Sequence, residues 1–423
     1  MDATSPSPPA RTPLRRASLL RSLRFLGVWG PGLLVMLADN DAGNVVTAAQ
    51  AGAEWGFRLL PLLLGLIPLL YMVQELAVRL GIFTGCGFGE LIRKTFGAGW
   101  AALAAVGLVV ATAGSLVTEF TGIAGIGDLY DVPRAFTLSI AAVILLLVVL
   151  TGSFRRTERA LLLIGLFQLA FFAVASAAHP DPAMVWRDVW DLPVSDRSFL
   201  YLSAALVGAV FNPWMVFYQQ SAVADKRLTA ADYRSERWDT AVGAVLTQLL
   251  TASVLVAVAA TMGRHGGVTL NSVGEISAAL DPLLGAAVAR PIFGVGVLGA
   301  AMVAAVVSSL ALTWGIGEVA GFRRSLECRP TAAPWFYGIY ATCTVGAAVL
   351  VWLVPDLVGL NIAAQVLNAL LLPLVVGFLV TLAVRALPEG RRLRGWYLSV
   401  VVGFSIMVCA LGFVGGLSAL FPV

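Results

Sequence analysis

Charge is scarce in this sequence: only 12% of the 423 residues are Asp, Glu, Lys or Arg, about half the share of a typical soluble domain. Both histidines, His179 and His265, fall in loop stretches, so no histidine is expected inside a membrane span. Phosphate-binding glycine loops, catalytic triads and zinc motifs are missing too, so we expect neither an enzyme nor a resident cofactor. The four cysteines have no paired spacing, which argues against a disulfide framework: they are Cys86, Cys328, Cys343 and Cys409.

Apolar residues, in contrast, make up 59% of the chain. They occur in runs of roughly 20 or more, the length that a helix needs to cross the hydrocarbon core of a bilayer. Core helices of soluble proteins are shorter, so the runs indicate a polytopic α-helical membrane protein. The length criterion gives about eleven spans, with approximate centres at Asn40, Leu69, Ser115, Leu145, Gln168, Phe211, Leu250, Val306, Val345, Leu371 and Val408.

The sequence predicts a single transmembrane domain over residues 25–423, preceded by a tail over residues 1–24. The tail is rich in Pro, Ser and Arg and lacks the apolar segment of a signal peptide, so we expect it to be disordered and cytoplasmic. Within the domain we expect a first repeat over residues 25–180, a second over residues 198–385, and an extra helix over residues 395–420.

The net charge of +4 does not indicate a nucleic-acid partner, because the basic residues do not gather in one patch. They lie in loops on one side of the spans, as at Arg155 and Arg156, whereas Asp131, Asp281 and Asp356 lie in loops on the other side. The positive-inside rule therefore predicts that the amino terminus lies in the cytoplasm. We expect the membrane to be a bacterial inner membrane. With an odd number of spans the carboxyl terminus would be outside. We expect a monomer whose surroundings are the lipid bilayer.

Two of the expected spans carry residues that interrupt a helix. The first contains Asp39 to Asn44, in which glycine and the side chains of Asp and Asn disfavour helical backbone. The sixth contains Asn212-Pro213 at mid-depth, and proline removes a backbone donor and clashes with the preceding turn. Broken backbone at this depth is tolerated only where it is buried or lines a cavity. Two such breaks, five spans apart, point to the substrate site of an inverted-repeat transporter.

An isolated carboxylate near the bilayer centre costs at least about 2.5–3.5 kcal/mol. Asp39 and Asp41 both lie there, and no Lys or Arg lies near mid-depth in any span to pair with them. We therefore expect a cation as their partner, and oxygen ligands alone suit Mg²⁺, Ca²⁺ or Mn²⁺. The candidate metal ligands are Asp41, Asn44, the Ala209 carbonyl, Asn212 and Gln365, with Asp39 as a second carboxylate that attracts the hydrated ion.

Five segments, in order along the chain, resemble motifs of the Nramp family of divalent-metal transporters. Gly30-Pro31-Gly32 followed by Asp41-Ala42-Gly43-Asn44 resembles the first helix of that family. Gly208-Ala209-Val-Phe-Asn212-Pro213-Trp214 lies where the family has its sixth helix. The other three segments cover residues 74–85, 152–159 and 365–368. The resemblance extends over nearly the whole chain and implies transport of divalent metal ions.

Departures from the family's pattern determine the expected substrate. Asn212 stands where the family has a metal-binding methionine, and Trp214 where it has a histidine linked to proton transfer. Leu116 replaces an acidic residue of the third helix, although Glu119 is kept. These features resemble the Nramp-related magnesium transporters, a branch that carries Mg²⁺ along with Mn²⁺ and lacks proton coupling. The resemblance implies uptake of Mg²⁺, and also of Mn²⁺, by uncoupled electrogenic uniport.

The expected fold is an all-α integral membrane protein with two inverted five-helix repeats (a leucine-transporter-like fold), broken helices one and six, and one extra helix. Three alternatives to the magnesium uniporter stay open. One is a proton-coupled Mn²⁺/Fe²⁺ Nramp transporter. Another is an organic-solute carrier of the same fold, for example for amino acids, which Asp39 and Asp41 disfavour because they would repel a carboxylate. The third is a receptor or gated channel, which two repeat-related broken helices disfavour.

Overall fold

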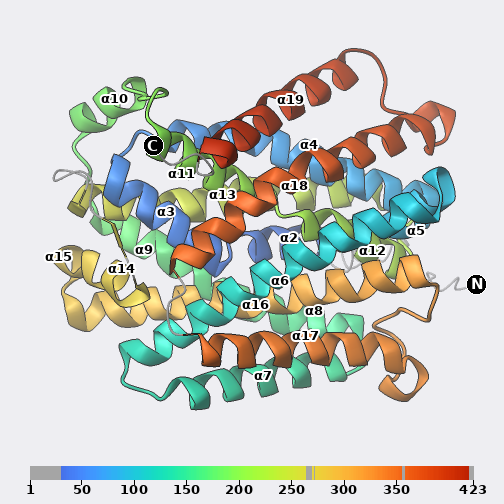
Figure 1. Ribbon diagram of the computed structural model, residues 1–423, viewed down its shortest axis with the longest axis horizontal. Coiled ribbons are helices and arrows are strands. Elements are labelled where there is room, and N and C mark those ends of the chain that lie inside the picture. Colours follow the sequence, from blue (N-terminus) through green and yellow to red (C-terminus); the bar gives the residue numbers. More distant parts are fainter. Residues whose placement is uncertain (1–29, 263–268, 271, 355–357, 419–423) are drawn as a thin grey trace, which may run out of the picture.

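The computed structural model describes residues 30–262, 269–270, 272–354 and 358–418, and within these ranges all regular structure is helical. The predicted all-α class is confirmed. Most helix axes run along the long dimension of the molecule, so that the helices form one bundle (Figure 1). The predicted tail over residues 1–24, His265 and Asp356 lie outside the described residues.

The first half of the bundle contains five spans, the first and fifth of which are divided. The short helix α5 lies between the second and third spans, and α10 follows the fifth span. Each has only nine residues. The bounds are α2 Pro31–Asp39, α3 Ala42–Trp55, α4 Leu60–Thr84, α5 Phe88–Phe96, α6 Ala98–Leu129, α7 Arg134–Leu150, α8 Phe154–Gly165, η1 Leu166–Leu169, α9 Ala170–Ala177 and α10 Pro182–Trp190.

The second half repeats this plan and adds one helix at its end. Its bounds are α11 Arg197–Val210, α12 Pro213–Asp225, α13 Tyr233–Met262, α14 Val273–Ala279, α15 Asp281–Leu284, α16 Ala286–Ala320, η2 Pro330–Ala332, α17 Pro334–Leu353, α18 Val358–Arg385, η3 Glu389–Arg391 and α19 Gly395–Ser418. The first span of this half is again divided, between α11 and α12.

The predicted number of spans is confirmed. In the part of the chain that the structure describes, nine helical segments are long and apolar enough to cross a membrane. The shorter apolar helix α7 and the divided pair α2–α3 bring the total to eleven. Each predicted centre lies within the corresponding span, and two of them, Asn40 and Phe211, lie at the breaks themselves.

The two halves are inverted with respect to each other. In the first half α5 follows the second span, and in the second half α14 and α15 follow the equivalent span, α13. These connecting helices lie at opposite ends of the bundle, α5 at the right of Figure 1 and α14 with α15 at the left. Such an exchange of ends is what an inverted-topology repeat produces.

Burial separates the central helices from the peripheral ones. In the most apolar 18-residue stretch of α16, and in that of the α11–α12 pair, 89% of the residues are buried inside the protein. In α19 the buried share is 33%. A helix that is apolar all round suits either a buried position or a lipid-facing one. The divided span α11–α12 therefore lies in the interior of the bundle, and the extra helix α19 lies at its edge.

Candidate metal site

The first break lies between α2 and α3, as predicted. Asn40 and Asp41 leave the helical conformation, and Asp41 becomes the N-cap of α3. Its Oδ1 accepts a hydrogen bond of 2.6 Å from the backbone N–H of Asn44. The backbone N–H of Ala42 donates to Glu119 Oε2 on α6, at 3.1 Å. Carboxylates thus satisfy the first N–H groups of α3, which have no partner within the helix.

The second break lies between α11 and α12, and here too the sequence prediction is confirmed. Pro213 begins α12, where its missing N–H is one that no helical carbonyl would accept. The side-chain amide of Asn212 donates a hydrogen bond of 2.9 Å to the Ala209 carbonyl oxygen. Both residues are buried, and this hydrogen bond joins the two predicted ligands of the second break.

Helix α18 meets both breaks at Gln365. A Cβ atom added to Gly43 would lie 1.9 Å from Gln365 Nε2, and one added to Gly208 would lie 1.7 Å from the Gln365 carbonyl oxygen. Only glycine at these two positions lets α3 and α11 approach α18 this closely. The structure therefore brings Gln365 against both breaks, although they are more than 160 residues apart in sequence.

Asn368 completes this arrangement and was missing from the predicted ligand set. Its side-chain amide donates to Asn212 Oδ1 at 2.6 Å and to Gln365 Oε1 at 3.0 Å. Its position could have indicated it as a site residue, because Asn368 follows Gln365 by one turn on the same face of one helix. It lay in a segment that resembled a family motif, but nothing in the sequence linked it to Asn212.

Several buried oxygen atoms at the first break are available to a cation. Asp41 Oδ2 and Asn44 Oδ1 are fully buried and have no hydrogen-bond partner among the described residues. Asn361 Oδ1, which lies 3.2 Å from a Cβ added to Gly43, is likewise without one. These are hard carboxylate and amide donors of the type that Mg²⁺ and Mn²⁺ accept.

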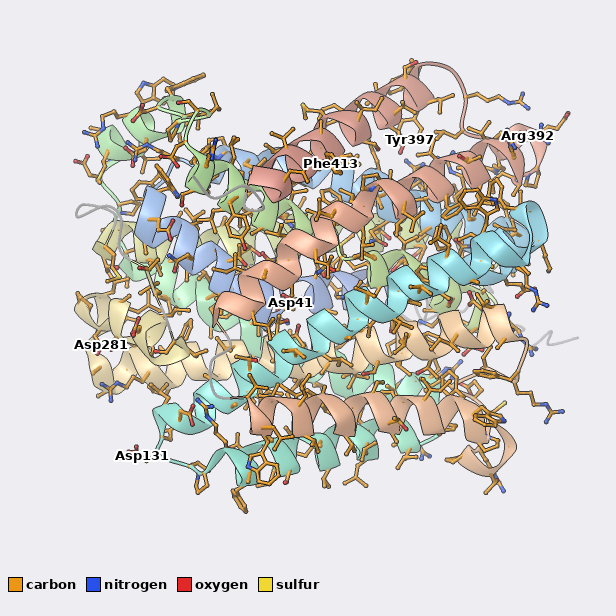
Figure 2. All side chains as sticks on the ribbon, in the orientation of Figure 1. Asp41, Asp131, Asp281, Arg392, Tyr397 and Phe413 are labelled. Carbon is orange, nitrogen blue, oxygen red and sulfur yellow. The ribbon has the colours of Figure 1, made fainter. Side chains whose placement is uncertain are left out.

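In the part of the chain that the structure describes, His, Cys, Asp and Glu side chains alone do not form a cluster that could hold a metal ion. Across residues 30–262, 269–270, 272–354 and 358–418, no three of them converge with the geometry of metal ligands. Any metal bound at the breaks therefore depends on amide and carbonyl oxygens around Asp41. Asp41 lies about midway between the end of the bundle that carries Asp281 and the end that carries Arg392 (Figure 2).

Glu119 lies beside Asp41. The two carboxyl groups are in contact, and both side chains are fully buried. Two such groups can both be ionised only if a cation lies with them, since their mutual repulsion is strong in a medium of low dielectric. No described Lys or Arg forms an ion pair with either one. The sequence had indicated Glu119 only as a retained acidic residue, and the structure places it at the candidate site.

Asp39 faces a different neighbour. Its carboxylate points to Thr247 on α13, whereas that of Asp41 points to α6. Between them, Asn40 fixes the break in position. The Asn40 side chain donates to Gln168 Oε1 at 2.8 Å and accepts from Thr251 Oγ1 at 2.9 Å. The structure thus brings together Asp41, Asn44 and Gln365 on one side of the break and directs Asp39 to the other.

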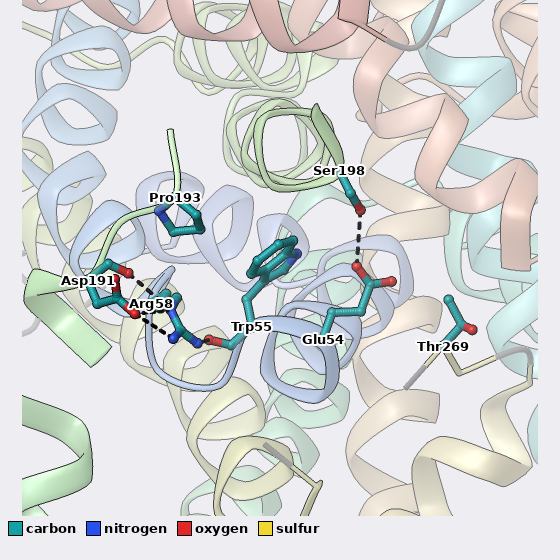
Figure 3. A pocket seen from close by; sticks show the side chains of 7 residues that line it. All are labelled: Glu54, Trp55, Arg58, Asp191, Pro193, Ser198 and Thr269. Atoms are coloured by element: carbon teal, nitrogen blue, oxygen red, sulfur yellow. Dashed lines mark hydrogen bonds and ion pairs between the residues drawn. The ribbon is translucent and has the colours of Figure 1, made fainter. Parts of the chain in front are cut away.

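A pocket of about 540 Å³ opens at the far end of α3 (Figure 3). Glu54 lines it, and Arg58 and Asp191 form an ion pair of 2.6 Å at its edge. Gln50, one turn closer to Asp41 along α3, bonds to Glu54 and accepts a hydrogen bond of 2.9 Å from the backbone N–H of Leu270. The Gln50 side chain is buried and lies along α3 between this pocket and Asp41.

Comparison with known proteins identifies the family. The sequence matches the profile of Nramp, described as Natural resistance-associated macrophage protein-like, over residues 32–417. The divalent metal cation transporter MntH of Agrobacterium fabrum is 27% identical over 68% of this chain and 65% of its own length. MntH 1 of Pseudomonas aeruginosa is 30% identical over 67% of each chain. These alignments span about two thirds of the length of the curated relatives.

Solved structures show the same architecture. A manganese transporter of Eremococcus coleocola superposes with a TM-score of 0.74 at 18% identity, covering 96% of this chain and 88% of that one. A Na⁺-coupled sialic acid symporter superposes with a TM-score of 0.59 at 12% identity, covering 93% and 90%. The predicted leucine-transporter-like fold is thereby confirmed. With a family profile matched over nearly its whole length, this multi-pass membrane protein belongs to the Nramp family.

Proposed function

We propose that this protein carries divalent metal cations across the membrane by exposing the site between its two broken helices alternately to either side. The observation that carries the proposal is Asp41 Oδ2, a buried carboxylate oxygen with no hydrogen-bond partner among the described residues, beside Asn44 Oδ1, which likewise has none there. A divalent cation would offset the cost of burying that charge. The names of the relatives, divalent metal cation transporters, support the same substrate class.

Mg²⁺ is the substrate that the donor atoms favour, with Mn²⁺ as a second one. Asp41, Asn44, Ala209 and Asn212 have only oxygen as a possible ligand atom, since the position of the family's methionine thioether is held by Asn212. Gln365 has an amide oxygen too, and its side-chain amide would rotate to present that oxygen, because its nitrogen faces Gly43. Hard oxygen donors suit Mg²⁺ and Mn²⁺, whereas a thioether favours softer metals. Mg²⁺ keeps several of its waters, so a site with one or two carboxylates and a few amides is sufficient for it. The metal is cargo, and no resident cofactor is invoked.

Transport would be uncoupled and electrogenic. Trp214 and Leu116, which cannot exchange protons, occupy positions where the family has titratable groups, and both are buried. An inside-negative potential supplies about 4.6 kcal/mol per 100 mV to a doubly charged ion that crosses the whole field. Because this potential draws cations into the cell, the direction is uptake. The distribution of basic residues supports an amino terminus in the cytoplasm. We propose that the functional unit is a monomer.

Proton-coupled transport is the second candidate, and one observation favours it. Glu119 contacts Asp41, so a proton held between the two carboxyl groups could leave when a metal ion binds. Under this alternative each metal ion that enters would be accompanied by protons.

Reconstituted liposomes with an internal pH dye and an imposed K⁺ diffusion potential test the proposal. We expect Mg²⁺ and Mn²⁺ uptake that grows with the potential and brings no stoichiometric acidification. Absence of uptake of any divalent cation would contradict the proposed substrate class. Uptake with stoichiometric acidification would replace the uniporter by the proton-coupled candidate.

A further inference from the structure

Asp39 is a fully buried carboxylate at the carboxyl-terminal end of α2. Neither of its oxygen atoms has a hydrogen-bond partner in the part of the chain that the structure describes. The polar side chain beside it is Thr247 of α13, whose buried hydroxyl lies against the carboxylate and has no other partner among the described residues. The carboxylate and the hydroxyl face each other across the α2–α13 interface.

The donors nearest to Asp39 in sequence are engaged elsewhere. The Asn40 amide donates to Gln168, and the Thr251 hydroxyl donates to Asn40. The Asn44 amide donates to the backbone carbonyl of Asp39, at 3.1 Å, and not to its carboxylate. No described Lys or Arg forms an ion pair with Asp39. A buried carboxylate left in this state is strongly unfavourable inside a membrane unless a cation accompanies it.

The end of α2 adds further negative potential at this point. The last carbonyl groups of a helix have no partner within the helix and carry the negative end of its dipole. α2 ends at Asp39 itself, so its terminal carbonyl groups and the Asp39 carboxylate lie together. Carboxylate, hydroxyl and carbonyl oxygens are hard donors that suit an unpolarisable cation.

We propose that Asp39 and Thr247 form a second cation site, distinct from that at Asp41, which binds a monovalent alkali cation such as Na⁺. The charge of the cation follows from the count of buried carboxylates at the break. Asp39, Asp41 and Glu119 carry three negative charges when ionised, and a divalent ion at Asp41 offsets two of them. A second divalent ion would leave one excess positive charge. In a medium of low dielectric, this is as unfavourable as the one negative charge that remains without it. This count rests on the proposed function, whereas the geometry at Asp39 does not.

Thermal unfolding of the full-length protein in detergent tests the second site. We expect NaCl or KCl to raise the melting temperature in a saturable way beyond an equal concentration of choline chloride, because a ligand that binds only the folded state stabilises it. Asp39→Asn should weaken this alkali response by about tenfold or more, since it removes the charged ligand. Thr247→Val should also weaken it. Ser253→Ala, on the same helix with its hydroxyl on the backbone carbonyl of Leu249, is the matched control and should keep it.

Asp41→Ala distinguishes the two sites. That variant should lose stabilisation by MnCl₂ and keep the alkali response, whereas Asp39→Asn should show the reverse. The second site is contradicted if wild type shows no alkali response beyond choline, or if the response survives Asp39→Asn. If Asp39→Asn does not fold, an alkali response that persists undiminished in Thr247→Val contradicts the second site. An alkali response without any response to divalent ions would contradict the proposed function but not the second site.

Discussion

Asn368 on α18 donates a hydrogen bond of 2.6 Å to Asn212 Oδ1, which fixes the side chain at the second break from a helix 156 residues further along the chain. Asn212 in turn donates to the Ala209 carbonyl at 2.9 Å. A carbonyl or amide oxygen has two lone pairs, so each can accept one hydrogen bond and still coordinate a cation. Asn368 therefore orients residue 212 without blocking it as a ligand.

Asn212→Met introduces the thioether of the family pattern at this position. If residue 212 faces the ion, the variant should bind Mn²⁺ and Cd²⁺ more tightly relative to Mg²⁺, because sulfur prefers softer metals. Competition by each metal against Mn²⁺ uptake in liposomes measures the change. Asn212→Leu, which also breaks the bond to Asn368 but adds no sulfur, should lower uptake without a shift towards Cd²⁺. An unchanged metal profile in Asn212→Met would remove residue 212 from the site.

Gly208→Ala should destabilise the protein. The new Cβ would lie 1.7 Å from the backbone carbonyl oxygen of Gln365, and backbone cannot move aside as a flexible side chain can. Overpacking of this kind costs about 1–3 kcal/mol or more, which a lowered melting temperature in detergent would report. Gly377→Ala is the control on α18, since a Cβ there meets no atom within 4 Å. Equal melting temperatures for the two variants would contradict the close contact of α11 with α18.

The main features of the fold could be predicted from the sequence because they depend on local properties. Apolar runs determine the spans, while Asp41-Ala42-Gly43 and Asn212-Pro213 disfavour helix wherever they occur. The interactions that shape the site depend on which helices meet. Glu119 caps α3 from α6, 77 residues away, and the Asp39 side chain turns to α13. No pattern within one segment carries that information, so the separation of Asp39 from Asp41 could not be predicted.

Glu119→Gln tests whether the contact with Asp41 carries protons. The amide oxygen can still accept the hydrogen bond from the Ala42 N–H, so the structure of the break should persist. Under the uniporter account, the variant still takes up Mg²⁺ in a potential-dependent manner, and neither it nor wild type acidifies the liposome interior. Acidification by wild type that disappears in Glu119→Gln would instead establish a proton path through this residue.

Glu54→Gln should raise the KM for Mg²⁺ by about two- to fivefold with little change in the maximal rate. Glu54 lines the pocket at the end of α3, and its charge raises the local concentration of cations there. The effect should shrink as salt is added, because salt screens exposed charge. Ser198→Ala removes a hydrogen-bond donor to Glu54 but no charge, and it should leave the KM unchanged. An unaltered KM for Glu54→Gln at low ionic strength would contradict a role of Glu54 in attracting the cation.

The most direct test of the central claim is Mg²⁺ uptake by Asp41→Ala in liposomes at a fixed inside-negative potential. Asp41 is both the N-cap of α3 and the proposed charged ligand, so Asp41→Asn, which keeps an acceptor for the Asn44 N–H, separates the two roles. We predict that both variants insert and fold but transport no Mg²⁺. Near wild-type Mg²⁺ uptake by Asp41→Ala would contradict the assignment of the metal site to the break between α2 and α3.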